Sequence, residues 1–102
     1  SSGDEKTISV DGVFLSIGWS PNTAIIKPFV ETIDGGYLKT DGKLMTSIPG
    51  IFAAGDVTDT PFKQAVISAG DGAKAAMGAA VYIQRSRGRE IGDVLSDRAK
   101  RK

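Results

Sequence analysis

The chain has 102 residues, of which 40% are apolar, which is enough for one small domain with a core and excludes a disordered protein. Its 13 basic and 12 acidic residues give a net charge of +1, so we expect no general attraction to nucleic acid or to a membrane surface. The sequence contains neither Cys nor His, which excludes disulfides, thiolate metal sites and the commonest general base. It also fits a cytoplasmic location.

Two short strands are predicted near the start of the chain, over residues 7–10 and 13–17, with a turn at Asp11-Gly12 between them. The second run reads VFLSI and is almost continuously apolar, which is typical of a strand covered on both faces. The turn-forming sequence GWSPN at 18–22 ends it.

A small hairpin is predicted in the middle of the chain. Turn sequences at 34–36 and 41–43 flank a short, half-exposed strand at 37–40. The apolar run IFAA at 51–54 predicts a further buried strand, which ends at Gly55-Asp56. A polar loop follows.

One long helix is predicted from about 63 to 84, because apolar residues recur there at intervals of three and four. The segment is rich in Gly and Ala, and each interior Gly costs about 1 kcal/mol of helix propensity. Close packing of a backbone or a ligand is the natural compensation. Residues 85–102 carry seven basic and three acidic side chains and are predicted to be a solvated tail, with one possible helical turn at 91–95.

The Gly55-Asp56 pair suggests a ligand site. In open α/β folds, ligands lie beyond the carboxyl ends of strands, and a Gly lets them approach the backbone. The Asp56 carboxylate is able to accept hydrogen bonds from two hydroxyls, as from a ribose or ribityl chain, and a helix start nearby offers unpaired N–H groups. The alternative is that Asp56 only caps its loop, as Asp often does in turns.

Three motifs carry a resemblance to a known family. Residues 46–56 (TSIPGIFAAGD), 10–23 (VDGVFLSIGWSPNT) and 63–73 (KQAVISAGDGA) resemble, in the right order, signatures of the pyridine nucleotide-disulfide oxidoreductases. They are most similar to the C-terminal part of the FAD domain of thioredoxin reductases. The resemblance implies an α/β fold, a partial Rossmann-like FAD/NAD(P)-binding domain with short buried strands and one long C-terminal helix. Residues 10–84 would belong to that domain, 1–9 to a preceding segment or hinge, and 85–102 to the tail.

The resemblance also implies a partial FAD site and no catalytic or metal-binding residue in this chain. Asp56 would hydrogen-bond the ribityl chain of FAD, and Gly55 would allow its close approach. The helix start would meet the flavin, where its dipole favours an anionic reduced ring. Asp71, inside the helix, would lie away from the ribityl chain, and Trp19 has no assigned role. The expected cofactor-binding residues are Gly55, Asp56, Val57, Lys63, Gln64 and Ala65.

The full enzyme would pass electrons from NADPH through FAD to a disulfide and on to a thioredoxin-like partner. Its dithiol CxxC and the glycine-rich nucleotide motifs do not occur in this sequence, so NADPH is not expected to bind here. The chain would need the remainder of the FAD domain and an NADPH domain, and a homodimer is plausible. Alone, we expect it to be inactive, to retain FAD weakly or not at all, and to self-associate through exposed apolar surface.

Three alternatives stay open. The chain is also compatible with the flavoprotein component of alkyl hydroperoxide reductase or with a ferredoxin/flavodoxin–NADP reductase of the same scaffold. The third alternative is a non-catalytic association module that uses the small-residue helix.

Overall fold

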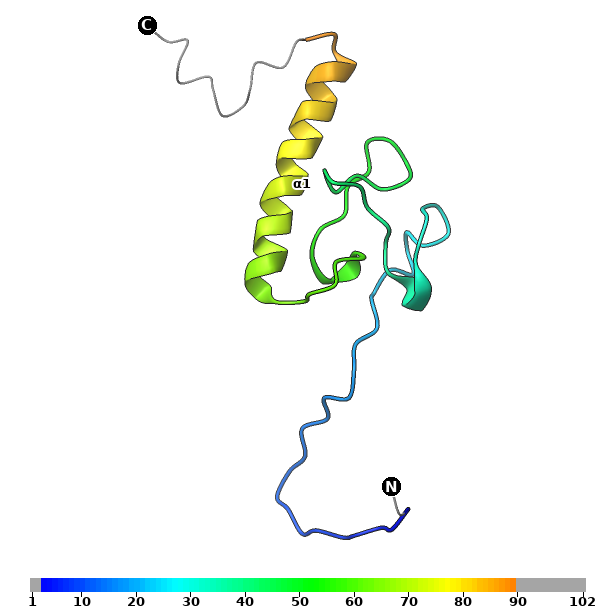
Figure 1. Cartoon of the computed structure of the whole chain (residues 1–102), viewed down its shortest axis with the longest axis vertical. Coiled ribbons are helices and arrows are strands. Elements are labelled where there is room, and N and C mark those ends of the chain that lie inside the picture. Colours follow the sequence, from blue (N-terminus) through cyan, green and yellow to red (C-terminus); the bar gives the residue numbers. More distant parts are fainter. Residues whose placement is uncertain (1–2, 90–102) are drawn as a thin grey trace, which may run out of the picture.

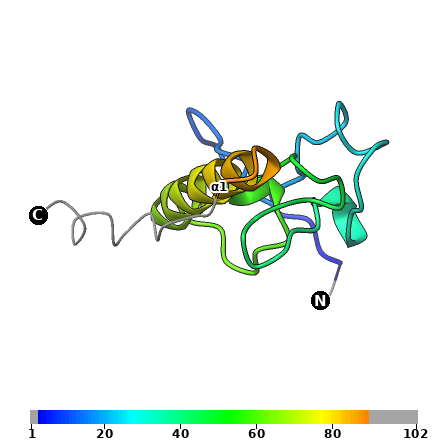
Figure 2. The same cartoon turned by 90° about the horizontal axis from the view of Figure 1, so that it is seen from above.

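The computed structural model describes residues 3–89 and is dominated by one helix, α1, at Ala65–Ser86. Two short 3-10 turns precede it, η1 at Asp34–Gly36 and η2 at Gly55–Val57. Residues of about 30–60 form loops that lie along one side of α1, whereas the N-terminal segment runs away from both (Figure 1; Figure 2 gives the view from above). The radius of gyration is 20.4 Å, compared with about 13 Å for a compact domain of this length.

The predicted helix is present, shifted by two residues at each end. It begins after Gln64, whose backbone is extended. It ends where Gly88 takes a left-handed conformation (φ 67°) and donates its N–H to the carbonyl of Arg85. This is a common glycine-dependent way to satisfy the last carbonyls of a helix. The predicted tail at 85–102 lies outside the described residues except for 85–89, as does the possible turn at 91–95.

The predicted strands are reduced to isolated bridges within residues 3–89. Leu38 forms an antiparallel bridge with Thr32 across η1 and a parallel bridge with Thr58. The bridge across η1 is the expected hairpin in its smallest form. Met45 pairs antiparallel with Phe52. Segment 51–54 is therefore extended and half-buried rather than a fully buried strand.

The prediction that 13–17 is a buried strand is wrong. Phe14 is fully exposed, and Val13, Leu15 and Ile17 are each at least 78% exposed. Residues 7–10 are also unpaired and exposed. A strand needs neighbouring strands to bond its N–H and C=O groups, and the described chain supplies none beside these segments.

The core is small and lies among the loops. Val30, Leu38 and Leu44 are its buried apolar side chains. Buried threonines join them, and each hydroxyl donates a hydrogen bond to a backbone carbonyl, as buried polar groups must. These bonds are Thr23 to Gly36 (2.8 Å), Thr46 to Ile51 (3.0 Å) and Thr58 to Gly55 (2.7 Å).

No helix within residues 3–89 is long and apolar enough to cross a membrane.

Candidate functional site

The turn η2 connects the half-buried segment 51–54 to the loop before α1. Its first residue, Gly55, is buried and has φ 81°, a left-handed conformation that favours glycine. A Cβ atom added there would lie 3.2 Å from Ser68 Oγ and 3.3 Å from Ser68 Cβ. Gly55 therefore permits two things at once, the sharp turn and the close approach of α1.

The next residue, Asp56, has an exposed carboxylate that is anchored on one side. Ser68 Oγ, one turn into α1, donates a hydrogen bond of 2.8 Å to Asp56 Oδ1. Within the described residues, Oδ2 of Asp56 has no hydrogen-bond partner. One oxygen therefore fixes the orientation of the carboxylate, and the other is free to accept a bond from a ligand.

A cavity of about 150 Å³ lies beside this carboxylate. Its walls come from three places in the sequence: the GWSPN turn, the hairpin and the η2 loop. The lining residues are Trp19, Ser20, Pro21, Asn22, Tyr37, Asp56, Val57 and Lys63. The Tyr37 hydroxyl donates a long hydrogen bond of 3.5 Å to the Trp19 carbonyl, which ties two of these walls together.

Lys63 contributes a cation to the same cavity, and its position is well defined. Its Nζ donates to the carbonyls of Thr58 (3.1 Å) and Thr60 (3.2 Å). The same atom lies 4.2 Å from the centroid of the Tyr37 ring, which is a cation–π distance. The loop and the ring hold the ammonium group in place before any ligand arrives.

The start of α1 offers further donors. Gln64 occupies the N-cap position, but its side chain makes no capping hydrogen bond. Ala65 is the first helical residue and is exposed. Within the described residues, the N–H groups of residues 65–67 have no acceptor, while Ser68 N bonds the Gln64 carbonyl. Unpaired N–H groups and the positive end of the helix dipole favour an anionic group there.

The structure thus brings Asp56, Val57 and Lys63 together around one cavity. Gly55 lies behind it, and Gln64 and Ala65 lie at the adjoining helix start. The sequence reasoning missed Ser68 and Tyr37, since neither stands in a chemically distinctive pattern. It left Trp19 without a role, and the structure places Trp19 in the cavity wall.

The Asp71 side chain is not simply a solvated surface carboxylate. Its Oδ2 atom is buried and has no hydrogen-bond partner in the described part of the chain. It also lies only three residues after Ser68, the partner of Asp56. No group of residues among 3–89 has the composition of a metal site.

Comparisons with known proteins agree on one family. The family described as pyridine nucleotide-disulphide oxidoreductase matches residues 1–80. An alkyl hydroperoxide reductase subunit of Staphylococcus aureus is 48% identical over 86 residues, which are 84% of this chain and 17% of that protein. The Pseudomonas putida protein of the same name is 44% identical over 86 residues, again 84% of this chain and 16% of that protein.

Solved structures give a similar result. The thioredoxin reductase of T. acidophilum matches with a TM-score of 0.73 and 41% identity, over 83% of this chain and 28% of that one. The thioredoxin reductase of Gloeobacter violaceus matches with a TM-score of 0.60 and 38% identity, over 72% of this chain and 24% of that one. The chain therefore spans less than a fifth of the length of these curated relatives and about a quarter of the length of these solved structures.

Proposed function

The chain belongs to the pyridine nucleotide-disulphide oxidoreductase family, and from this premise we propose that residues 55–65 form one wall of an FAD site. The observation that carries the proposal is the Asp56 carboxylate, which is held by Ser68 on one oxygen and open on the other, at the edge of a cavity. Residues 10–84 would then be the C-terminal portion of an FAD domain.

The side chains present fit such a cofactor. Asp56 Oδ2 is a charged acceptor for hydroxyls of a ribityl chain. The N–H groups of residues 65–67 are donors without acceptors in the described chain, which suits the polar edge of a flavin ring. Gly55 leaves no side chain between the turn and α1. When bound, FAD would supply the two-electron carrier between a pyridine nucleotide and a disulfide.

The residues of this chain would then bind and orient the cofactor, and they would set the electrostatic potential of its site. Asp56 would fix the position of the hydroxylated chain. The helix start would stabilise negative charge by about 0.3–2 kcal/mol, depending on burial. Lys63, held by two carbonyls and the Tyr37 ring, would add a fixed positive charge to the cavity wall.

The proposed activity of the whole protein is electron transfer from NADPH through FAD to a disulfide. Relatives that are named as subunits of alkyl hydroperoxide reductase support an acceptor in that enzyme system. The solved thioredoxin reductases support a thioredoxin-like acceptor. The dithiol that would distinguish the two acceptors is not among the residues of this sequence. We also propose two protein partners, a thioredoxin-like protein and a second copy of the chain.

The test is an FAD titration of apoprotein in a full-length enzyme that carries this segment. Asp56→Ala removes a charged acceptor, and a hydrogen bond to a charged group contributes about 1.5–3 kcal/mol. At about 1.4 kcal/mol per factor of ten, FAD affinity should fall roughly ten- to a hundredfold. Asp34→Ala is the control, because Asp34 is exposed in η1 and lines no part of the cavity.

Ser68→Ala separates the ligand role of Asp56 from the structural alternative. This substitution breaks the same 2.8 Å hydrogen bond between η2 and α1 but keeps the carboxylate. If Asp56 binds FAD, Ser68→Ala should weaken FAD binding much less than Asp56→Ala does. Equal losses would show that Asp56 acts only by tying the loop to the helix. A full-length protein that rejects FAD altogether would instead support a non-catalytic association module.

A further inference from the structure

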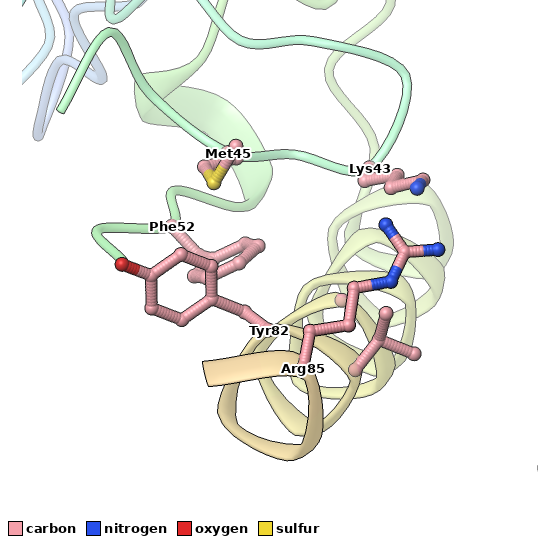
Figure 3. A pocket seen from close by; sticks show the side chains of 7 residues that line it. Lys43, Met45, Phe52, Tyr82 and Arg85 are labelled. Atoms are coloured by element: carbon pink, nitrogen blue, oxygen red, sulfur yellow. The ribbon is translucent and has the colours of Figure 1, made fainter. Parts of the chain in front are cut away.

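A second concavity lies between the C-terminal half of α1 and the loop at 41–52, and it goes beyond the proposed FAD function. Figure 3 shows its side chains: the rings of Phe52 and Tyr82 lie on one side, and Lys43 and Arg85 on the other. The two rings meet edge to face, with centroids 6.3 Å apart and an interplanar angle of 73°. The lining residues are Lys43, Met45, Phe52, Gly78, Val81, Tyr82 and Arg85.

The concavity has a small inner part and a larger open part. The inner part, next to Met45 and Phe52, has a volume of about 70 Å³. It adjoins an open trough of about 360 Å³, which shares Lys43, Val81 and Arg85 and extends along α1 to Lys74. We call the two parts together the α1 groove.

The floor of the α1 groove is a tight junction between the helix and the loop. A Cβ atom at Gly78 would lie 2.8 Å from the Lys43 carbonyl oxygen and 3.0 Å from Phe52 Cε1. The helix and loop backbones therefore touch at Gly78, which sets the separation of helix and loop at the inner part.

The rim of the α1 groove is basic. Lys43, Lys74 and Arg85 all line it, and no acidic residue does. The one ion pair between side chains of residues 3–89 joins Lys39 and Glu31 elsewhere, so these three cations have no carboxylate partner there. Three cations around an apolar floor are complementary to an anionic partner with an apolar anchor.

We propose that the α1 groove binds an acidic peptide segment of a partner protein. One aliphatic side chain would enter the inner part, and carboxylates before and after it would meet Lys43, Lys74 and Arg85. The inner volume of about 70 Å³ fits the end of one side chain, and the open trough of about 360 Å³ accommodates the residues on either side of it. Lys74 and Arg85 are 11 residues apart on α1, an axial rise of about 16 Å, which an extended segment of about five residues spans.

The test uses the 102-residue chain and an acetylated, fluorescently labelled peptide, Asp-Glu-Leu-Glu-Asp, with binding followed by anisotropy. Binding should weaken as salt is added, because exposed charges are screened. Arg85→Glu should weaken it about three- to tenfold, since one rim attraction becomes a repulsion. Arg87→Glu is the matched control: this residue has the same charge near the same helix end but does not line the groove, so the change should stay below about twofold.

A second peptide tests the apolar anchor. Asp-Glu-Gly-Glu-Asp has the same charge without the Leu side chain and should bind at least about threefold more weakly. Equal binding of the two peptides, or equal losses with Arg85→Glu and Arg87→Glu, would overturn the proposal in favour of general charge attraction. Absence of binding to both would also overturn it.

The chain's own sequence between 90 and 97 has similar chemistry, with Glu90, Asp93 and Asp97 around apolar residues. The double substitution Asp93→Asn and Asp97→Asn in the full chain removes both carboxylates without adding a cation and should leave peptide affinity unchanged within about twofold. A gain of about tenfold or more would show that the groove was already occupied by this segment, which would overturn an external partner.

Discussion

Replacing Gly78 by Ala is expected to destabilise the chain, whereas the same replacement at Gly72 is expected to stabilise it. Both glycines are interior residues of α1. A Cβ atom at Gly72 would meet nothing within 4 Å in the described structure. At Gly78 it would lie 2.8 Å from a backbone oxygen of the loop, the Lys43 carbonyl, closer than real Cβ contacts come.

The sizes of the two effects follow from this difference. Gly→Ala in a helix interior gains about 1 kcal/mol of intrinsic propensity at either site. Overpacking at a close contact costs about 1–3 kcal/mol, and at Gly78 the obstructing atom belongs to the backbone and cannot rotate away. Gly78→Ala should therefore lower the free energy of unfolding by about 0–2 kcal/mol, whereas Gly72→Ala should raise it by about 1 kcal/mol.

Urea unfolding followed by far-ultraviolet circular dichroism would measure both variants, because α1 provides most of the helical signal. The expected result is a higher midpoint for Gly72→Ala and an unchanged or lower one for Gly78→Ala, with similar slopes. If Gly78→Ala stabilised the chain as much as Gly72→Ala does, α1 would not lie against the 41–52 loop. That result would also remove the α1 groove.

Three further outcomes are expected. Asp41 accepts hydrogen bonds from the N–H groups of Met45 and Lys43, which lower its pKa below the ordinary 3.8. The loop should thus keep this support at neutral pH and lose it as pH falls through the lowered pKa, seen as amide shifts of both residues by NMR that Asp41→Ala abolishes. Thr58→Val should lower the free energy of unfolding by about 0.5–1.5 kcal/mol, because the buried hydroxyl and its hydrogen bond to the Gly55 carbonyl are removed while that carbonyl keeps its bond from the Thr58 N–H; an unchanged midpoint would contradict this. Phe14→Ser should reduce self-association, measured by light scattering, because it removes a fully exposed apolar side chain. Unchanged scattering would mean that this exposed segment is not the surface through which the chain associates.

The local features of the fold were predictable from sequence. The helix at Ala65–Ser86 was predicted from apolar spacing, which acts over a few residues. The turn at η1 follows from its Asp-Gly-Gly sequence in the same way. The compensation expected for the helix glycines is confirmed at Gly78, where backbones touch, while Gly70 and Gly72 have no such contact within residues 3–89.

The strands were not predictable in the same way, because a strand depends on its neighbours. The VFLSI run has the composition of a buried strand, yet it is exposed, because no other strand lies beside it in the part of the chain that the structure describes. The candidate site likewise depends on contacts between elements that are distant in the sequence. Gly55-Asp56 suggested a ligand site, but the contact with Ser68 and the ring of Tyr37 under Lys63 depend on how the helix and hairpin meet.

Trp19 gives the candidate FAD site its own optical signal. It is the only tryptophan of the sequence, and it lines the same cavity as Asp56 and Lys63. In this chain its indole is 83% exposed, so its emission should be that of a water-exposed indole. A yellow cofactor bound beside it would absorb in the range where indole emits and would quench that emission by energy transfer. The fluorescence of one native side chain would thus report occupancy of the cavity without any added label.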